Sequence, residues 1–230
     1  MEEENVIELA RRYLNVGPVA VKFNFSEKNK SADIPSKPLK YCEAVSRVMK
    51  TSKSMLLDCD HISCPAAKEI LGFMECNQCK MGECVKELVE KGMFANEERA
   101  IKALMSIPRP TRKPHSMSLS TNEMMPDVYI FYLLPREFMK IVQAYQRVTG
   151  EELKLDLSGV MSVCGNCTVR PYLTNKVCVS FGCNDSREYG GITDDRLIVG
   201  LTPKVAATIM HSLMEMMNGN SEESKKEVKM

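Results

Sequence analysis

Apolar and polar residues follow one another along the chain with two periods, one typical of helices and one typical of strands. Apolar residues recur at helical spacing from Val6 to Tyr13, and strict alternation follows from Val19 to Phe25. A short strand pattern lies at Ser54 to Leu57. Further helical patterns occupy residues 44–49, 65–71, 85–91 and 95–105. We therefore expect the first half to open with a helix and a strand and to continue mainly as helices.

The second half contains more strand patterns. Val128 to Leu134 is a continuous apolar run that suits a central strand covered on both faces. Alternation predicts further strands at 117–121, 153–157, 177–181 and 197–201. Helical spacing predicts helices over 138–145 and 205–216. Together these elements predict an α+β fold, with a mixed sheet, flanking helices, cysteine-rich loops and room for a βαβ unit.

Domain boundaries are suggested by proline and by charge. An extended connector is predicted at 108–114 because it holds Pro108, Pro110 and Pro114, together with the basic residues Arg109, Arg112 and Lys113. We interpret those charges as solvated, an anion site being the alternative. The sequence predicts a single domain over 1–218, with two lobes joined near 108–116 as the alternative, and a disordered charged tail over 219–230.

The balance of charged residues argues against two classes of partner, nucleic acids and anionic membranes. The 230 residues hold 31 Lys and Arg against 30 Asp and Glu, a formal charge of +1, which does not favour nucleic acid or an anionic membrane as partner. The longest apolar run is far shorter than the roughly 20 residues that cross a bilayer. The first residues are acidic, unlike a signal peptide. We therefore expect a cytoplasmic protein without nucleic-acid or membrane partners.

Ten cysteines are the main chemical signal, because nine of them fall into two runs and Cys42 stands alone. The first run is Cys59, Cys64, Cys76, Cys79 and Cys84, and the second is Cys164, Cys167, Cys178 and Cys183. Each run contains one C-x-x-C pair and enough thiols for a tetrahedral zinc or a four-iron cluster. Their irregular spacing favours iron–sulfur. His61 is an alternative ligand, and burial without metal remains an alternative for every cysteine.

Two local features qualify these runs. Cys64 precedes Pro65, which suits the first helical position, so Cys64 is expected at a helix N-cap where a thiolate is favoured as ligand or nucleophile. Cys178 and Cys183 would lie about 15 Å apart on a straight strand, and they can share a metal only if the chain turns at Gly182. The glycine pair Gly190–Gly191 predicts a turn, with a cation or phosphate site as the alternative.

Six short segments spread over most of the chain carry a resemblance. They are Pro18–Lys22, Tyr41–Val45, Cys64–Ala67, Gln143–Tyr145, Pro171–Leu173 and Cys183–Arg187. In this order they resemble the landmarks of the bacterial and archaeal domain of unknown function 169 family, from about Tyr13 to Met217. The family name implies no established reaction.

The resemblance implies a ranking of the cysteines. Cys42, Cys64 and Cys183 lie within landmark segments, and Cys164 lies in a segment that often carries a cysteine in similar proteins. These four are therefore expected to meet in one site. Cys76, Cys79 and Cys84 look like an addition to the family pattern, which implies a second metal site or a larger cluster.

Three functions are consistent with these observations. The leading hypothesis is an iron–sulfur protein of anaerobic metabolism with one or two clusters, most simply [4Fe–4S], that transfers electrons to a redox protein or assists a redox enzyme. The first alternative is a structural zinc protein that binds a small ligand or a protein partner. The second is a thiol enzyme with Cys64 or Cys164 as nucleophile. The sequence contains no P-loop, no G-x-G-x-x-G and no H-E-x-x-H motif.

Overall fold

A six-stranded sheet forms the centre of the molecule. The computed structural model describes residues 5–26, 33–75, 81–122 and 125–227, and of residues 81, 83 and 219–227 it describes the backbone alone. Its strands are β1 (Val19–Asn24), β2 (Met55–Leu57), β3 (Ser116–Ser120), β4 (Val128–Leu133), β5 (Cys178–Ser180) and β6 (Leu197–Leu201). They lie in the order β2-β3-β1-β4-β6-β5, and all pairings between them are antiparallel.

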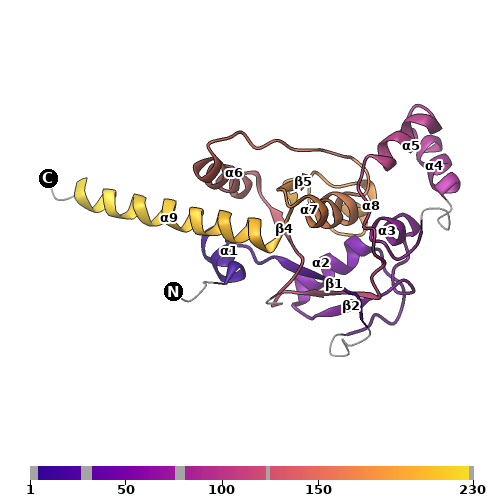
Figure 1. The fold of residues 1–230 in the computed structure, drawn as a ribbon, viewed down its shortest axis with the longest axis horizontal. Coiled ribbons are helices and arrows are strands. Elements are labelled where there is room, and N and C mark those ends of the chain that lie inside the picture. The colour runs from indigo at the N-terminus through magenta and orange to yellow at the C-terminus, as the bar shows by residue number, and fades with distance from the viewer. Residues whose placement is uncertain (1–4, 27–32, 76–80, 123–124, 228–230) are drawn as a thin grey trace.

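Helices cover both faces of this sheet (Figure 1). One face packs against α1 (Val6–Leu14), α6 (Pro135–Thr149) and α9 (Pro203–Glu227). The other face packs against α2 (Tyr41–Thr51), α3 (Pro65–Ile70) and the π-helix η1 (Ser162–Val169). The short helices α7 (Arg170–Thr174) and α8 (Asn184–Glu188) flank β5 in sequence. All six residues of β4 are buried because both faces are covered, which explains its continuous apolar run.

Two further helices project from the body at one end (Figure 1). They are α4 (Met81–Glu90) and α5 (Glu97–Met105). Their buried residues Val85, Ala100 and Leu104 nevertheless belong to the same hydrophobic core as α2 and α3. The connector near 108–116 therefore leads from a projecting helix pair back to strand β3.

The predicted α+β class is confirmed, with differences in detail. The sheet is antiparallel rather than mixed, so no βαβ unit, which needs parallel neighbours, occurs among the described strands. Residues 153–157 form no strand, although Leu153 and Leu155 alternate inward because they pack against the core cluster that the sheet shares with α1, α6 and α9. Strand β5 ends at Ser180, and Phe181 is exposed.

The last helix is longer than its sequence pattern predicts. The backbone of α9 continues to Glu227, beyond residue 218 where the predicted charged tail begins, and its far end extends away from the sheet (Figure 1). The single-domain assignment over 1–218 stays a prediction. No described helix is both long enough and apolar enough to span a bilayer.

A cysteine-lined cavity as candidate functional site

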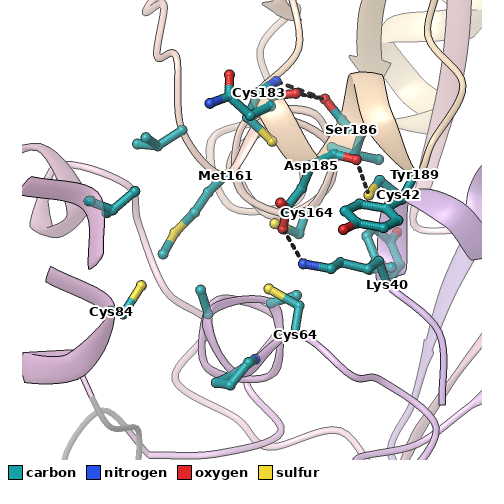
Figure 2. Close-up of a pocket in the computed structure, with 18 of the residues that line it drawn as sticks. Lys40, Cys42, Cys64, Cys84, Met161, Cys164, Cys183, Asp185, Ser186 and Tyr189 are labelled. Carbon is teal, nitrogen blue, oxygen red and sulfur yellow. Dashed lines mark hydrogen bonds and ion pairs between the residues drawn. The ribbon is translucent and has the colours of Figure 1, made fainter. Parts of the chain in front are cut away.

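A cavity of about 450 Å³ lies on the α2 side of the sheet, and five cysteines line it. They come from five separate helices, as Cys42 of α2, Cys64 before α3, Cys84 of α4, Cys164 of η1 and Cys183 before α8. Figure 2 shows four of the sulfurs gathered at one end, with Cys84 on the opposite wall and the thioether of Met161 reaching between them. Residues far apart in the sequence thus share one hollow.

Two of these cysteines sit at the same position of a short helix. Cys64 is the N-cap of α3, where Pro65 follows it at the first helical position. Cys183 is the N-cap of α8, and its backbone N–H donates to the Ser186 hydroxyl at 2.7 Å. The same hydroxyl donates back to the Cys183 carbonyl at 2.8 Å. The predicted N-cap position of Cys64 is confirmed.

Cys164 is positioned by an unusual stretch of backbone. Met161 adopts a left-handed conformation at φ 48°, and η1 begins directly after it. Helices with π-type hydrogen bonding and left-handed non-glycine residues both occur preferentially at functional sites, because they carry strain that the surrounding structure must hold. Gly165 lets η1 lie close to Ile107, because a Cβ at position 165 would be only 2.9 Å from the Ile107 side chain.

Cys42 and Cys183 are brought together by contacts between α2 and α8. Lys40, just before α2, forms an ion pair with Asp185 at 2.7 Å and lies over the Tyr189 ring at 4.8 Å. The Cys42 thiol donates to the Asp185 carbonyl at 3.6 Å. These contacts, of which the ion pair and the thiol hydrogen bond are drawn as dashed lines in Figure 2, hold the first turns of the two helices side by side.

A second set of contacts ties α2 to η1. The Tyr41 hydroxyl is hydrogen-bonded to the Thr168 hydroxyl at 3.0 Å, and Thr168 donates to the Val163 carbonyl at 2.7 Å. All three residues are buried. Buried hydrogen bonds of this kind define one relative position for the helices that carry Cys42 and Cys164.

Three thiols of this cavity, those of Cys42, Cys64 and Cys164, are held in their neutral form. Burial, together with nearby Cys183 and Asp185, raises the pKa of Cys42 to about 12. Burial likewise raises the pKa of Cys64, against the opposing effects of the Ala67 backbone N–H and the Lys40 charge. The pKa of Cys164 lies well above its ordinary value, first through burial and then through Cys64. Without a bound cation, these buried sulfurs disfavour one another's charge.

The rest of the cavity lining combines apolar and charged residues. Leu88, Met93, Leu104 and Val160 contribute apolar surface. Lys91 is paired with Glu87 on α4, and Lys40 is paired with Asp185. Glu188 also lines the cavity and forms no ion pair with a described residue, so the lining has one carboxylate more than it has cations.

The remaining cysteines lie elsewhere, so the two sequence runs do not correspond to two sites. Cys167 is buried, and its thiol donates to the Ile198 carbonyl at 3.4 Å. Cys178 is buried in β5 and donates to the Lys176 carbonyl at 3.6 Å. Cys59 is half-buried and does not line the cavity, and Cys76 and Cys79 lie outside the described residues. Cys59, Cys167 and Cys178 therefore lie apart from the five cysteines of the cavity, and their assignment as metal ligands stays a prediction.

His61 also lies outside the cavity. Its Nδ1 is 2.6 Å from the Asp58 carboxylate, and it is not among the lining residues. Among the side chains that the structure describes, no group of three or more His, Cys, Asp or Glu residues is arranged to hold a metal ion directly. The sulfurs surround open space instead.

Sequence reasoning missed several residues of this site. Lys40 and Met161 belong to no motif, and their places follow only from the packing of α2 and η1. Asp185 lies within the landmark segment Cys183–Arg187, so a signal for it existed. Cys84 lines the cavity although its sequence neighbours Cys76 and Cys79 suggested a separate addition.

Comparison with known proteins identifies the family of this chain. The family model of DUF169, described as "Uncharacterised ArCR", matches residues 12–212. The chain is 24% identical over 177 residues to "Uncharacterized protein MJ0308" of Methanocaldococcus jannaschii, which covers 76% of each chain. No solved structure matches the chain. Because the family model spans most of the sequence and agrees with the landmarks from Tyr13 to Met217, this protein belongs to the DUF169 family.

Proposed function

We propose that this protein binds an iron–sulfur cluster through Cys42, Cys64, Cys164 and Cys183 and acts in electron transfer or as an accessory to a redox enzyme. The observation that carries the proposal is the meeting of these four cysteines, from four helices, at one end of one cavity. Buried inert cysteines are distributed by hydrophobicity alone, which gives no reason for four of them to share a hollow.

The size of the cavity supports a cluster over a single ion. A tetrahedral zinc draws four sulfurs to about 2.3 Å from the metal and leaves no space between them. Here the sulfurs line a hollow of about 450 Å³. Four thiolates around a larger inorganic core are the ligand set of a [4Fe–4S] cluster.

The backbone around the sulfurs supports the same assignment. N–H groups of Glu43, Ala67 and Gly165 stabilise the thiolate forms of Cys42, Cys64 and Cys164, respectively. Hydrogen bonds to cluster sulfurs and burial from solvent are the means by which proteins adjust the reduction potential. Lys40 adds a positive charge at the wall, which favours the anionic state of a thiolate-bound cluster.

A bound cluster would supply one-electron chemistry close to the surface. Two ion pairs, Lys40 with Asp185 and Lys91 with Glu87, leave Glu188 as the one excess charge among the described lining residues. So small a net charge suits a redox partner that docks through shape and apolar contact rather than through strong charge steering. We place the protein in the cytoplasm, in anaerobic metabolism, where an oxygen-sensitive cluster persists.

Anaerobic purification tests the proposal directly. We expect a broad absorption band near about 400 nm and matching amounts of iron and acid-labile sulfide, about four of each for one cluster. Stoichiometric zinc without sulfide would instead assign the structural zinc alternative. A colourless, metal-free protein that cannot be reconstituted with iron and sulfide would contradict any metal role and leave a thiol enzyme as the alternative.

Single substitutions identify the ligands. Serine in place of Cys42, Cys64, Cys164 or Cys183 should abolish or strongly reduce the iron content. Cys59→Ser is the matched control, because Cys59 is half-buried and lies outside the cavity. Cys84→Ser should retain four irons, since its sulfur lies on the opposite wall. If Cys59→Ser lost as much iron as Cys64→Ser, relative to the wild type, the four cysteines of the cavity would not be the ligand set.

A further inference from the structure

A second cavity, of about 460 Å³, lies at the end of the sheet where β1 and β6 begin and β3 and β4 end. Its walls come from segments that meet only in the fold, including Arg11 at the end of α1, Thr121 after β3, Tyr132 of β4 and Arg196 before β6. Volumes of this size hold metabolite-sized ligands. None of the cysteines lines it.

The floor of this cavity is built around a glycine. Val19 of β1 pairs with Ile130, so continuing the antiparallel register by two residues sets Gly17 opposite Tyr132. On the other side, Ala20 pairs with Ser120, which sets Thr121 opposite Val19. Side chains two residues apart share a face of a sheet, so Thr121 and Tyr132 lie on either side of Gly17.

An arginine occupies the space above this glycine. A Cβ at Gly17 would lie 3.2 Å from the Arg11 Nε, so a larger residue would displace the guanidinium. Arg11 Nη2 donates to the Thr121 carbonyl at 3.5 Å. Across the cavity, Arg196 Nη1 donates to the Tyr132 carbonyl at 3.1 Å. Two guanidinium groups are thus fixed by backbone contacts on opposite sides.

Positive charge at this cavity is only partly compensated. Arg196 lies 3.9 Å from the Glu137 carboxylate, whereas no described carboxylate lies within ion-pair distance of Arg11. The described lining residues include no Asp or Glu. Lys50 adds a third cation at the edge, since its Nζ would lie 2.9 Å from a Cβ at Gly191. Guanidinium groups bind carboxylate and phosphate through paired N–H donors.

We propose that this second cavity binds a small organic oxyanion, with its carboxylate or phosphate group between Arg11 and Arg196. The proposal rests on two guanidinium groups held by backbone contacts and on a lining without carboxylates, and it does not depend on a cluster at the cysteine-lined cavity.

Titration calorimetry with two probes tests this site. Inorganic phosphate and succinate would be titrated separately into the full-length protein, against sodium chloride at matched ionic strength. We expect saturable binding of at least one probe at one site per chain. Phosphate alone would indicate a phosphorylated ligand and succinate alone a carboxylic acid, whereas failure of both probes to saturate would overturn the proposal.

Matched variants separate this site from surface charge. Arg11→Gln should weaken binding by about tenfold or more, as expected for the loss of a charged donor. Arg12→Gln is the control, because Arg12 is the next residue, carries the same charge and lies over the Tyr13 ring outside the cavity. Equal weakening in Arg11→Gln and Arg12→Gln would refute the site.

Discussion

Gly200 in β6 shows how one residue sets the distance between the sheet and η1. A Cβ at Gly200 would lie 2.1 Å from the Cys167 carbonyl oxygen and 2.7 Å from its carbon. These are backbone atoms and cannot rotate away. Gly200→Ala should therefore lower the free energy of unfolding by about 3 kcal/mol or more, measured by urea denaturation. Gly159→Ala, where a Cβ meets nothing within 4 Å, should change it by less than about 0.5 kcal/mol.

The buried thiol of Cys178 should make the free energy of unfolding depend on pH in the alkaline range. Burial raises the pKa of its thiol from 9.0 to about 11. As the pH rises through this interval, the unfolded chain releases the Cys178 proton while the folded chain retains it, so stability present below pH 9 is lost. Wild type should lose about 2 kcal/mol more than Cys178→Ala between neutral pH and about pH 10.5 in urea unfolding. Identical losses in the two proteins would contradict this assignment.

At the scale of single residues, the sequence predicted which chemical groups are present better than which of them meet in the fold. Cys64 could be assigned to a helix N-cap from the proline after it, because that preference is local. The place of Cys59 outside the cavity could not be predicted from its spacing to Cys64, whereas the strand distance between Cys178 and Cys183 already counted against a shared site for those two. Cys84 was grouped with Cys76 and Cys79, yet it faces the cavity because α4 packs near α3 and η1.

At the scale of elements, helix α3 is anchored by a buried ion pair. Glu69 is 4% exposed, and Arg109 binds its Oε1 through both Nε and Nη2 at 2.7 Å. Arg109 also donates to the Leu104 and Ile107 carbonyls at 3.3 and 3.0 Å. Arg109 therefore has a structural role, although its sequence context suggested a solvated charge. The position of Cys64 at the start of α3 depends on this anchor.

Removing one partner of the ion pair between Glu69 and Arg109 should show how much free energy it costs to bury the other alone. Arg109→Met leaves the Glu69 carboxylate without its ion pair, and we expect a loss of about 3 to 5 kcal/mol in urea unfolding. The double variant Glu69→Met with Arg109→Met should recover much of this loss, because two apolar residues need no compensation. Arg47→Met, which breaks an exposed pair with Glu43, is the control and should cost less than about 1 kcal/mol. A double variant no more stable than Arg109→Met would refute the argument.

Element prediction succeeded where burial on the sheet follows the local pattern. Strand β4 was predicted because a continuous apolar run needs cover on both faces, and the structure provides it. The alternation of Leu153 and Leu155 was interpreted as a strand for the same reason. There it reflects packing beside helices, since no neighbouring strand offers hydrogen bonds. Hydrophobic periodicity shows which side of a segment is buried. Strand formation also requires a neighbouring strand that accepts and donates backbone hydrogen bonds.

At the scale of the whole molecule, stability should differ between the sheet and the projecting helices. Strands β1, β4 and β6 lie inside the sheet with helices on both faces, whereas α4 projects beside α5 (Figure 1). In native-state hydrogen exchange with increasing urea, we expect amides of α4 to exchange through local opening and those of β4 to exchange only on global unfolding. Exchange of both sets with one common free energy would show that α4 is part of the same cooperative unit. The outcome bears on function, because α4 carries Cys84.

Local order alone accounts for the α+β class, for strands β1, β4 and β6, for the last helix, and for the supply of soft sulfur ligands. These follow from hydrophobic periodicity, proline position and side-chain chemistry, all of which act between near neighbours. The tertiary structure decided the antiparallel strand order, which cysteines share a cavity, and the second cavity between Arg11 and Arg196. Each of these depends on contacts between residues many positions apart, whose free energy is realised only when the sheet brings them together.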